Sequence, residues 1–265
     1  MKIKSAYTRS YISSSKFFIA LALAAFAMTP AKAAVTFGAS GLGNDTGETN
    51  SATATFNLFV SGTTTDLVIT LTNTAKYDPN DAPDILTGVF FTLAGDPTLT
   101  KMSAVLNTGS TGVEDGTNLT ILGGVVGGSW AYAAGLSGAP HGANEGISGA
   151  GLGLFGPGNL FPGAMLPGDK NPPSGVGGGL TTAIDDGSKY NGGVSGRPLI
   201  QDSVVFTLDG VPANFLLSDI SNVSFQYGTD TTEPNYVGVL IPEPSTAALT
   251  MAGIALLGLL NRKRR

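Results

Sequence analysis

The sequence has no cysteine and only one histidine, His141, among its 265 residues. The absence of cysteine excludes a disulfide framework, thiol catalysis and cysteine-ligated metal sites. One histidine cannot supply the usual zinc sites, and no Gly-x-Ser-x-Gly elbow is present to place a serine nucleophile beside it. His141 lies among glycines and is interpreted as a solvated loop residue, so the sequence predicts no cofactor and no enzyme activity.

Charged residues are also scarce, at 12% of the chain, and they are segregated. Nine of the 14 basic residues lie in the first 33 or the last four positions. The stretch 34–241 holds 18 of the 19 acidic residues and only five basic ones, which gives it a formal charge of −13. Such a surface repels phosphate backbones, and nucleic acid is therefore excluded as a partner.

Glycine and proline are abundant instead, with 38 and 15 residues, and they favour short strands and turns over long helices. Residues 52–60 alternate apolar with polar side chains, a turn follows, and residues 66–73 are rich in β-branched residues, which predicts a hairpin. Further strands are predicted at 88–93, 99–106, 129–133, 203–208, 223–227 and 236–240. The expected fold is all-β, an antiparallel β-sandwich or jelly-roll-like domain over residues 34–240.

One long segment, 135–196, holds 19 of the 38 glycines and six of the prolines. It is predicted to be a Gly/Pro-rich insertion that connects two sheet-forming halves. Apolar side chains within it favour a packed irregular excursion over disorder, because they can dock on the sheets. These side chains are Ile147, Leu152, Leu154, Phe155, Leu160, Phe161, Met165 and Leu166.

The N-terminus, residues 1–33, has the three parts of a secretory signal peptide. Basic residues precede an apolar run at 17–28, and small residues surround Lys32. The run spans 12 residues, too short for a stable membrane helix, so cleavage is predicted after Ala33. The alternative is an uncleaved anchor or a buried core helix, although a core helix would not need the basic flank.

The C-terminus, residues 241–265, has a different three-part pattern. Pro242 and Pro244 flank Glu243 and fix an extended backbone that a processing enzyme could grip as a strand. The apolar run at 246–260 predicts a transmembrane helix that would be a weak permanent anchor, because it is slightly shorter than the hydrocarbon core. The last four residues are basic, and they are predicted to stay in the cytoplasm: Arg262, Lys263, Arg264 and Arg265.

These residues resemble the PEP-CTERM sorting signal, in which Val-Pro-Glu-Pro precedes a hydrophobic helix and an Arg-rich tail. Ile241 stands in place of the usual valine, whereas Pro242, Glu243 and Pro244 match the pattern. The resemblance implies that exosortase, a membrane transpeptidase-like enzyme, processes the chain at this motif in a bacterium that makes extracellular polysaccharide. An ordinary tail anchor behind a Pro-rich linker is the alternative.

Three internal segments are similar to a recurrent type of exosortase-dependent surface protein. They are residues 84–91 (Asp-Ile-Leu-Thr-Gly-Val-Phe-Phe), residues 223–229 (Val-Ser-Phe-Gln-Tyr-Gly-Thr) and residues 146–156. The similarity extends over most of the mature chain but implies no activity.

Two ligand sites are weaker candidates. Carboxylate and amide oxygens in a proline-stiffened loop are the hard ligands that calcium prefers, although their spacing matches no EF-hand and a solvated turn is the simpler interpretation. The calcium candidates are Asp78, Asn80, Asp81 and Asp84. Trp130 and Tyr132 alternate on one strand face and could stack on a sugar ring, with core packing as the alternative.

The leading hypothesis is a non-enzymatic exported protein, delivered to the cell surface or the extracellular matrix as a structural or adhesive component of exopolysaccharide or biofilm. Its expected partners are the secretion machinery, exosortase, the inner membrane before processing, and extracellular polysaccharide. One alternative is a carbohydrate-binding module that uses an exposed Trp130 or Tyr132. The other is a secreted hydrolase whose carboxylates converge from distant strands.

Overall fold

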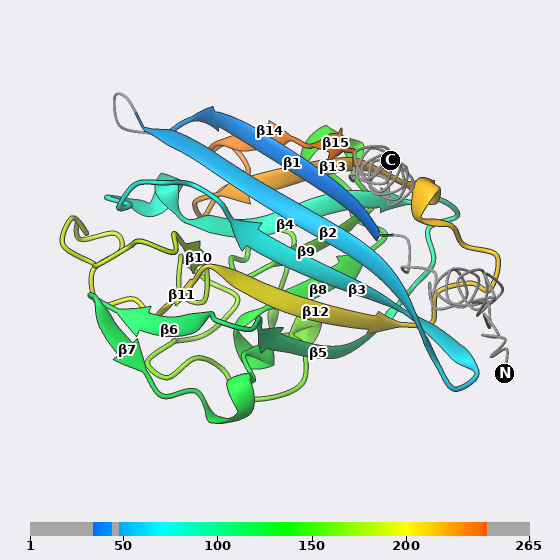
Figure 1. Cartoon of the computed structure of the whole chain (residues 1–265), viewed down its shortest axis with the longest axis horizontal. Coiled ribbons are helices and arrows are strands. Elements are labelled where there is room, and N and C mark those ends of the chain that lie inside the picture. The colour runs from blue at the N-terminus through cyan, green and yellow to red at the C-terminus, as the bar shows by residue number, and fades with distance from the viewer. Residues whose placement is uncertain (1–33, 44–47, 243–265) are drawn as a thin grey trace, which may run out of the picture. The chain divides into compact units, whose positions relative to one another are not determined.

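The computed structural model describes residues 34–43 and 48–242. Within these ranges the chain forms strands and short 3₁₀ helices but no α-helix, and none of its helices has the length and apolarity needed to cross a bilayer. The strands form two sheets, which are mostly antiparallel (Figure 1). The prediction of an all-β chain with antiparallel sheets is confirmed. The predicted signal peptide (1–33), membrane helix (246–260) and basic tail lie outside the described residues.

The first sheet has the strand order β15-β1-β2-β3-β12-β5. β2 and β3 pair continuously from Ala52 opposite Asn73 to Ser61 opposite Thr64, so the predicted hairpin is confirmed. β1 is absent from the predicted strands, because glycines interrupt its alternating pattern. The strands of this sheet are β1 (Ala34–Leu42), β2 (Thr49–Ser61), β3 (Thr64–Asn73), β5 (Thr100–Leu106), β12 (Ser203–Asp209) and β15 (Val239–Ile241).

The second sheet has the order β14-β13-β4-β10-β11-β6-β7, and β9 joins it by pairing with both β4 and β8. Among the described strands, β10 and β11 form the one parallel pair. The strands are β4 (Leu86–Leu93), β6 (Thr111–Glu114), β7 (Thr117–Leu119), β8 (Ala131–Ala134), β9 (Glu145–Ser148), β10 (Leu180–Thr181), β11 (Leu199–Gln201), β13 (Ile220–Tyr227) and β14 (Asn235–Val237).

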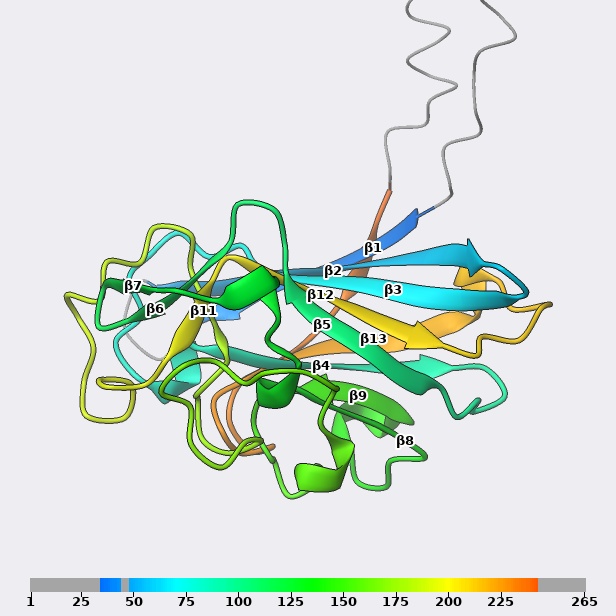
Figure 2. The same cartoon turned by 90° about the horizontal axis from the view of Figure 1, so that it is seen from below.

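The two sheets lie face to face with one large apolar core between them (Figure 2). β2 shows how the sequence produces this core, because Ala54 and Phe56 are fully buried while the alternate residue Thr55 faces outward. Phe56 meets Phe91 of the opposite sheet edge to face, with ring centroids 5.4 Å apart. Burial of each such ring stabilises the fold by roughly 2 kcal/mol.

The strand predicted at 236–240 is in fact two strands that belong to different sheets. β14 pairs with β13 in the second sheet and β15 pairs with β1 in the first, with Gly238 as the single residue between them. The Gly238 N–H donates to the Val223 carbonyl at 2.8 Å. A Cβ at this position would lie 3.1 Å from the Phe225 ring and 3.3 Å from Phe37, so only glycine fits closely here. Alternation alone does not reveal this change of sheet.

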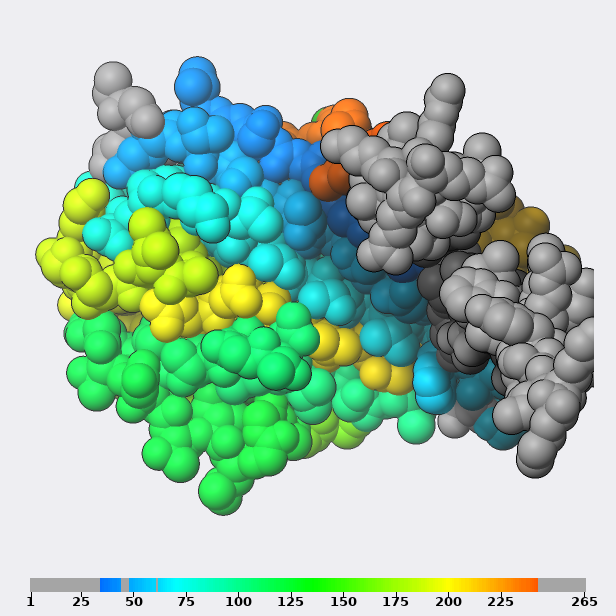
Figure 3. Space-filling view, in the orientation of Figure 1, coloured from blue at the N-terminus to red at the C-terminus, as the bar shows by residue number. Residues whose placement is uncertain are grey.

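The Gly-rich segment 135–196 is packed, and it differs from a simple insertion because it supplies β9 and β10 to the second sheet. Its residues Leu152, Phe155, Phe161 and Leu166 are buried as expected, whereas Met165 is exposed. The Asn191 N–H donates to the Asn80 carbonyl at 2.8 Å, which ties the segment to the preceding half of the chain. In the space-filling view its yellow-green residues lie directly beside the cyan part of the chain (Figure 3).

The three internal segments that resemble exosortase-dependent surface proteins lie on three adjacent strands, β13, β4 and β9. Val89 of β4 pairs with Phe225 of β13 on one side and with Ile147 of β9 on the other. Glycine at position 146 leaves room for two aromatic rings, since a Cβ there would lie 2.8 Å from the Phe90 ring and 3.0 Å from the Phe155 ring. The similar sequences are therefore packing sequences at the centre of the second sheet.

We predict that Gly146→Ala destabilises the domain by about 1 to 3 kcal/mol, because the new methyl group overpacks the buried ring of Phe90. Gly158→Ala is the matched control, since a Cβ there meets no atom within 4 Å. Urea unfolding of the two variants measures the difference. Equal midpoints for both variants would show that the strands separate easily enough to admit a methyl group.

Candidate functional site

The strand that precedes the Pro-Glu-Pro sequence is an integral part of the folded domain. β15 pairs with β1 up to its last residue, with Ile241 opposite Thr36. Pro242 follows at once and, lacking an N–H, cannot continue the ladder. Glu243 and Pro244 lie outside the described residues. The candidate processing motif therefore starts directly after a hydrogen-bonded strand, with no linker between them.

β15 is a short edge strand whose contacts with the domain are few. A Cβ on Gly38 would lie 2.7 Å from Ile241 Cδ1, so the Ile241 side chain covers this glycine. Val239, Leu240 and Ile241 are all exposed. A three-residue edge strand with little buried surface opens at a lower free-energy cost than the central strands.

The described domain begins and ends at the same end of the first sheet. β1 starts at Ala34, the residue after the predicted signal-peptide cleavage position, and β15 stops at Ile241. The two strands are antiparallel neighbours, so the first residues of β1 lie beside the last residues of β15 (Figure 1). Both sequence signals are consequently attached to the same end of the domain.

A family model for the PEP-CTERM protein-sorting motif matches residues 240–265. The chain carries a PEP-CTERM sorting motif. This motif implies an exported protein that exosortase processes, with transient membrane anchoring before surface release. Leu240 and Ile241 belong both to the PEP-CTERM motif and to β15. No curated protein and no solved structure matched the chain.

The aromatic residues proposed for sugar stacking are buried. Trp130 is fully buried and Tyr132 is 4% exposed. Trp130 packs edge to face on Phe206, with ring centroids 5.0 Å apart, and Tyr132 belongs to the same core. The hypothesis that these two rings form a carbohydrate-binding platform is therefore wrong, and both residues pack in the core.

The loop proposed for calcium is organised around a buried carboxylate. Asp84 is almost fully buried, and its Oδ2 accepts the N–H groups of Asn80 and Asp81 at 3.1 and 3.3 Å. Asp78 is half-buried in the same loop. In residues 34–43 and 48–242, no three His, Cys, Asp or Glu side chains are arranged to hold a metal ion. Calcium binding by this loop stays a prediction.

The histidine and the buried Asp185 both make structural contacts. His141 is exposed, with its Nε2 3.0 Å from Asn235 Oδ1. Asp185 is buried, and its carboxylate accepts the hydroxyl groups of Thr181 and Tyr190. The contacts of Asp185 fix a loop of the Gly-rich segment.

A buried acid that sequence reasoning missed lies on β9. Glu145 is fully buried; its Oε2 accepts the Tyr132 hydroxyl, and its Oε1 has no hydrogen-bond partner among the described residues. The pKa of Glu145 is raised to about 7, chiefly by burial; the Tyr132 hydrogen bond acts to lower it, and the charge of the nearby Asp96 acts to raise it. No motif marks this glutamate, because its burial results from the packing of the second sheet on the first.

We predict that Glu145 makes the domain less stable as the pH rises from 5 to 8. Its folded pKa of about 7 lies above its ordinary value of 4.5, so the folded state binds the extra proton in this range. The stability it contributes is complete below pH 4.5 and is lost as the pH rises through 7. Glu145→Gln should remove about 2 kcal/mol of this pH dependence.

Urea unfolding at several pH values measures the effect, with Glu114→Gln as a control at a less buried carboxylate. An unchanged pH profile in Glu145→Gln would contradict the raised pKa.

Proposed function

We propose that exosortase processing delivers the folded β domain intact to the cell surface or the extracellular matrix. There it serves as a structural or adhesive component of exopolysaccharide or biofilm, without enzymatic activity of its own. The observation that carries this proposal is the overlap of the PEP-CTERM motif with the last strand: the motif begins at Leu240, inside β15, and Pro242 follows the end of that strand. Processing beyond Ile241 leaves every described strand of the domain in place.

The position of β15 suits an enzyme that grips its substrate as an extended chain. Leu240 and Ile241 are already extended and exposed, and they pair with β1 on one side only. The other edge of β15 carries backbone groups that a substrate-binding strand can pair with. Pro242 disfavours a helical backbone at the preceding residue, Ile241, so the strand stays extended up to the motif. The domain thus presents the motif without a need to unfold.

The outer face of the first sheet supports a matrix role. Thr36, Thr55 and Thr70 stand opposite one another on β1, β2 and β3, and the Thr36 and Thr55 hydroxyl groups are 2.9 Å apart. Thr53 and Thr72 form the next row. Hydroxyl groups both donate and accept hydrogen bonds, as sugar hydroxyl groups do. The threonine rows carry no charge and fit a neutral polymer, whereas the acidic residues of the domain repel anionic ones.

We predict that replacing Pro242, Glu243 and Pro244 together with alanine leaves the protein unprocessed in the membrane fraction. Ile241→Val, which restores the usual Val-Pro-Glu-Pro, is the matched control and should be processed as the natural chain is. Mass spectrometry of membrane and released fractions identifies the C-terminus of each form. Normal release of the triple variant in processed form would end the assignment of sorting to this motif.

We predict that Thr55→Glu lowers cosedimentation of the released protein with neutral exopolysaccharide from its own cells by about tenfold, because it places a charge in the threonine row. Asn118→Glu adds the same charge at an exposed position on β7, away from this face, and should bind normally. Equal binding by both variants would exclude the threonine face as the matrix contact. A failure of cosedimentation by the natural protein would exclude the matrix role itself.

A further inference from the structure

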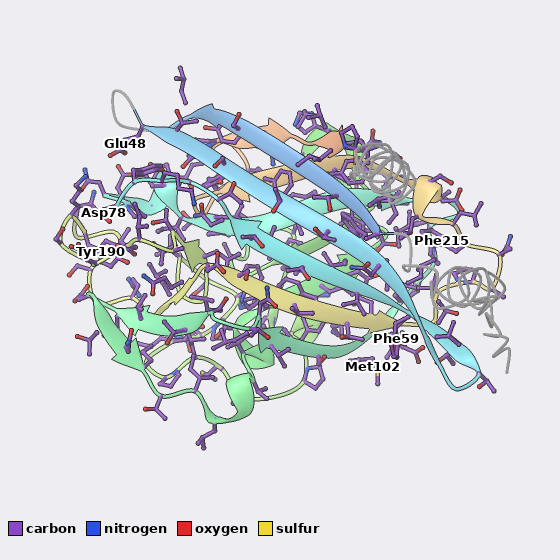
Figure 4. All side chains as sticks on the ribbon, viewed as in Figure 1. Glu48, Phe59, Asp78, Met102, Tyr190 and Phe215 are labelled. Carbon is purple, nitrogen blue, oxygen red and sulfur yellow. The ribbon has the colours of Figure 1, made fainter. Side chains whose placement is uncertain are left out.

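Exposed apolar side chains gather at the end of the domain where β1 begins and β15 stops, here called the apolar end. They are between 42% and 65% exposed: Phe59, Val60, Met102, Leu216, Leu240 and Ile241. Figure 4 shows Phe59 and Met102 at this end of the domain, while Glu48, Asp78 and Tyr190 lie at the opposite end. The apolar end therefore presents a group of half-exposed apolar side chains from several segments.

The strand registers bring the members of the apolar end together. β1 begins opposite Asn57, so Phe59 lies two residues beyond the start of β1, close to the tip of the β2–β3 hairpin. β2, β3, β12 and β5 are successive neighbours in the first sheet. Their pairing places Met102 of β5 at the same end of the sheet as Phe59 of β2. The short helix η6 (Leu217–Asp219), which follows Leu216, packs on β2. Four separate segments thus contribute to one end.

The covalent chain limits how far this end can lie from a membrane. Five residue steps separate Ile241 from position 246, where the apolar run of the PEP-CTERM motif begins. At most ~3.6 Å per step, this stretch cannot span more than about 18 Å. Since the motif implies transient anchoring, the apolar end stays close to the bilayer surface as long as the anchor is engaged.

We propose that the apolar end docks on the lipid bilayer while the chain is anchored, with Phe59 and Val60 inserted at the boundary between headgroups and acyl chains. This inference rests on the anchoring that the sorting motif implies. A pair of half-exposed apolar side chains binds a membrane weakly by itself, but the tether makes the contact intramolecular and raises the effective lipid concentration. Docking holds the Pro242 junction at the membrane surface, where a membrane-embedded processing enzyme can reach it.

The charges near the apolar end favour apolar insertion over attraction to anionic lipid. Asp66 and Asp209 pair with each other in the rung beside Phe59, and Lys101 stands on the neighbouring strand β5. Asp219 of η6 adds a third carboxylate, which accepts the Leu216 N–H. With three carboxylates against one ammonium group, anionic headgroups are repelled. The membrane surface that suits the apolar end is therefore the apolar interface of a neutral bilayer. The salt concentration should have little effect on this contact.

The test places a fluorescent reporter at each end of the domain in the full chain. Phe59→Trp marks the apolar end, and Leu42→Trp, at a residue that is 82% exposed, marks the far end of β1. Both variants are reconstituted into phosphatidylcholine vesicles with and without bromine on the acyl chains. The contribution of the buried Trp130 is subtracted with the natural chain.

We expect the tryptophan fluorescence of Phe59→Trp to shift to the blue, and brominated lipid to quench about half of it. The fluorescence of Leu42→Trp should stay unchanged. Equal quenching of the two reporters in chains that float with the vesicles would overturn docking but leave anchoring intact. A blue shift of the Phe59→Trp fluorescence without quenching by lipid would overturn docking and would indicate that the apolar end contacts a second copy of the chain. Chains that fail to float with vesicles would instead refute the anchoring itself, and docking with it.

Discussion

The pairing of β15 with β1 is the constraint on which the function of this chain depends. It places the first and the last described strands side by side, and the single-residue crossing at Gly238 fastens the second sheet to the first immediately before the motif. The sorting motif thus projects from a closed fold, and the domain and its signal share Leu240 and Ile241. A change that displaces β15 therefore affects both the edge of the sheet and the presentation of the motif.

Close backbone packing explains why glycine is so frequent in this domain. A Cβ on Gly127 would lie 2.1 Å from the carbonyl oxygen of Pro162, and one on Gly179 would lie 2.6 Å from Ile85. Such approaches let an irregular segment lie flat on the second sheet, where ordinary side chains would hold it away. The glycine of β9, Gly146, serves the same purpose, since it leaves room for the rings of Phe90 and Phe155.

Residue types that attract functional interpretation serve the core in this protein. Trp130 and Tyr132 have the chemistry of a sugar platform, yet both face the opposite sheet. Asp84 has the chemistry of a calcium ligand, yet its carboxylate accepts backbone N–H groups of its own loop. Glu145 has a pKa suited to acid–base work, yet it is closed off from solvent. In each case exposure decides the role, and exposure depends on contacts between residues far apart in the chain.

The sequence by itself determined the features that local pattern encodes. Alternation predicted the β2–β3 hairpin, and the order of prolines, apolar run and cations predicted the sorting motif, because both are read from residues close together in the chain. Only the tertiary structure decided that β1 is a strand, that residues 236–240 divide between two sheets, and that Trp130 is buried. These features arise from pairing and packing between distant segments, which a local pattern does not specify.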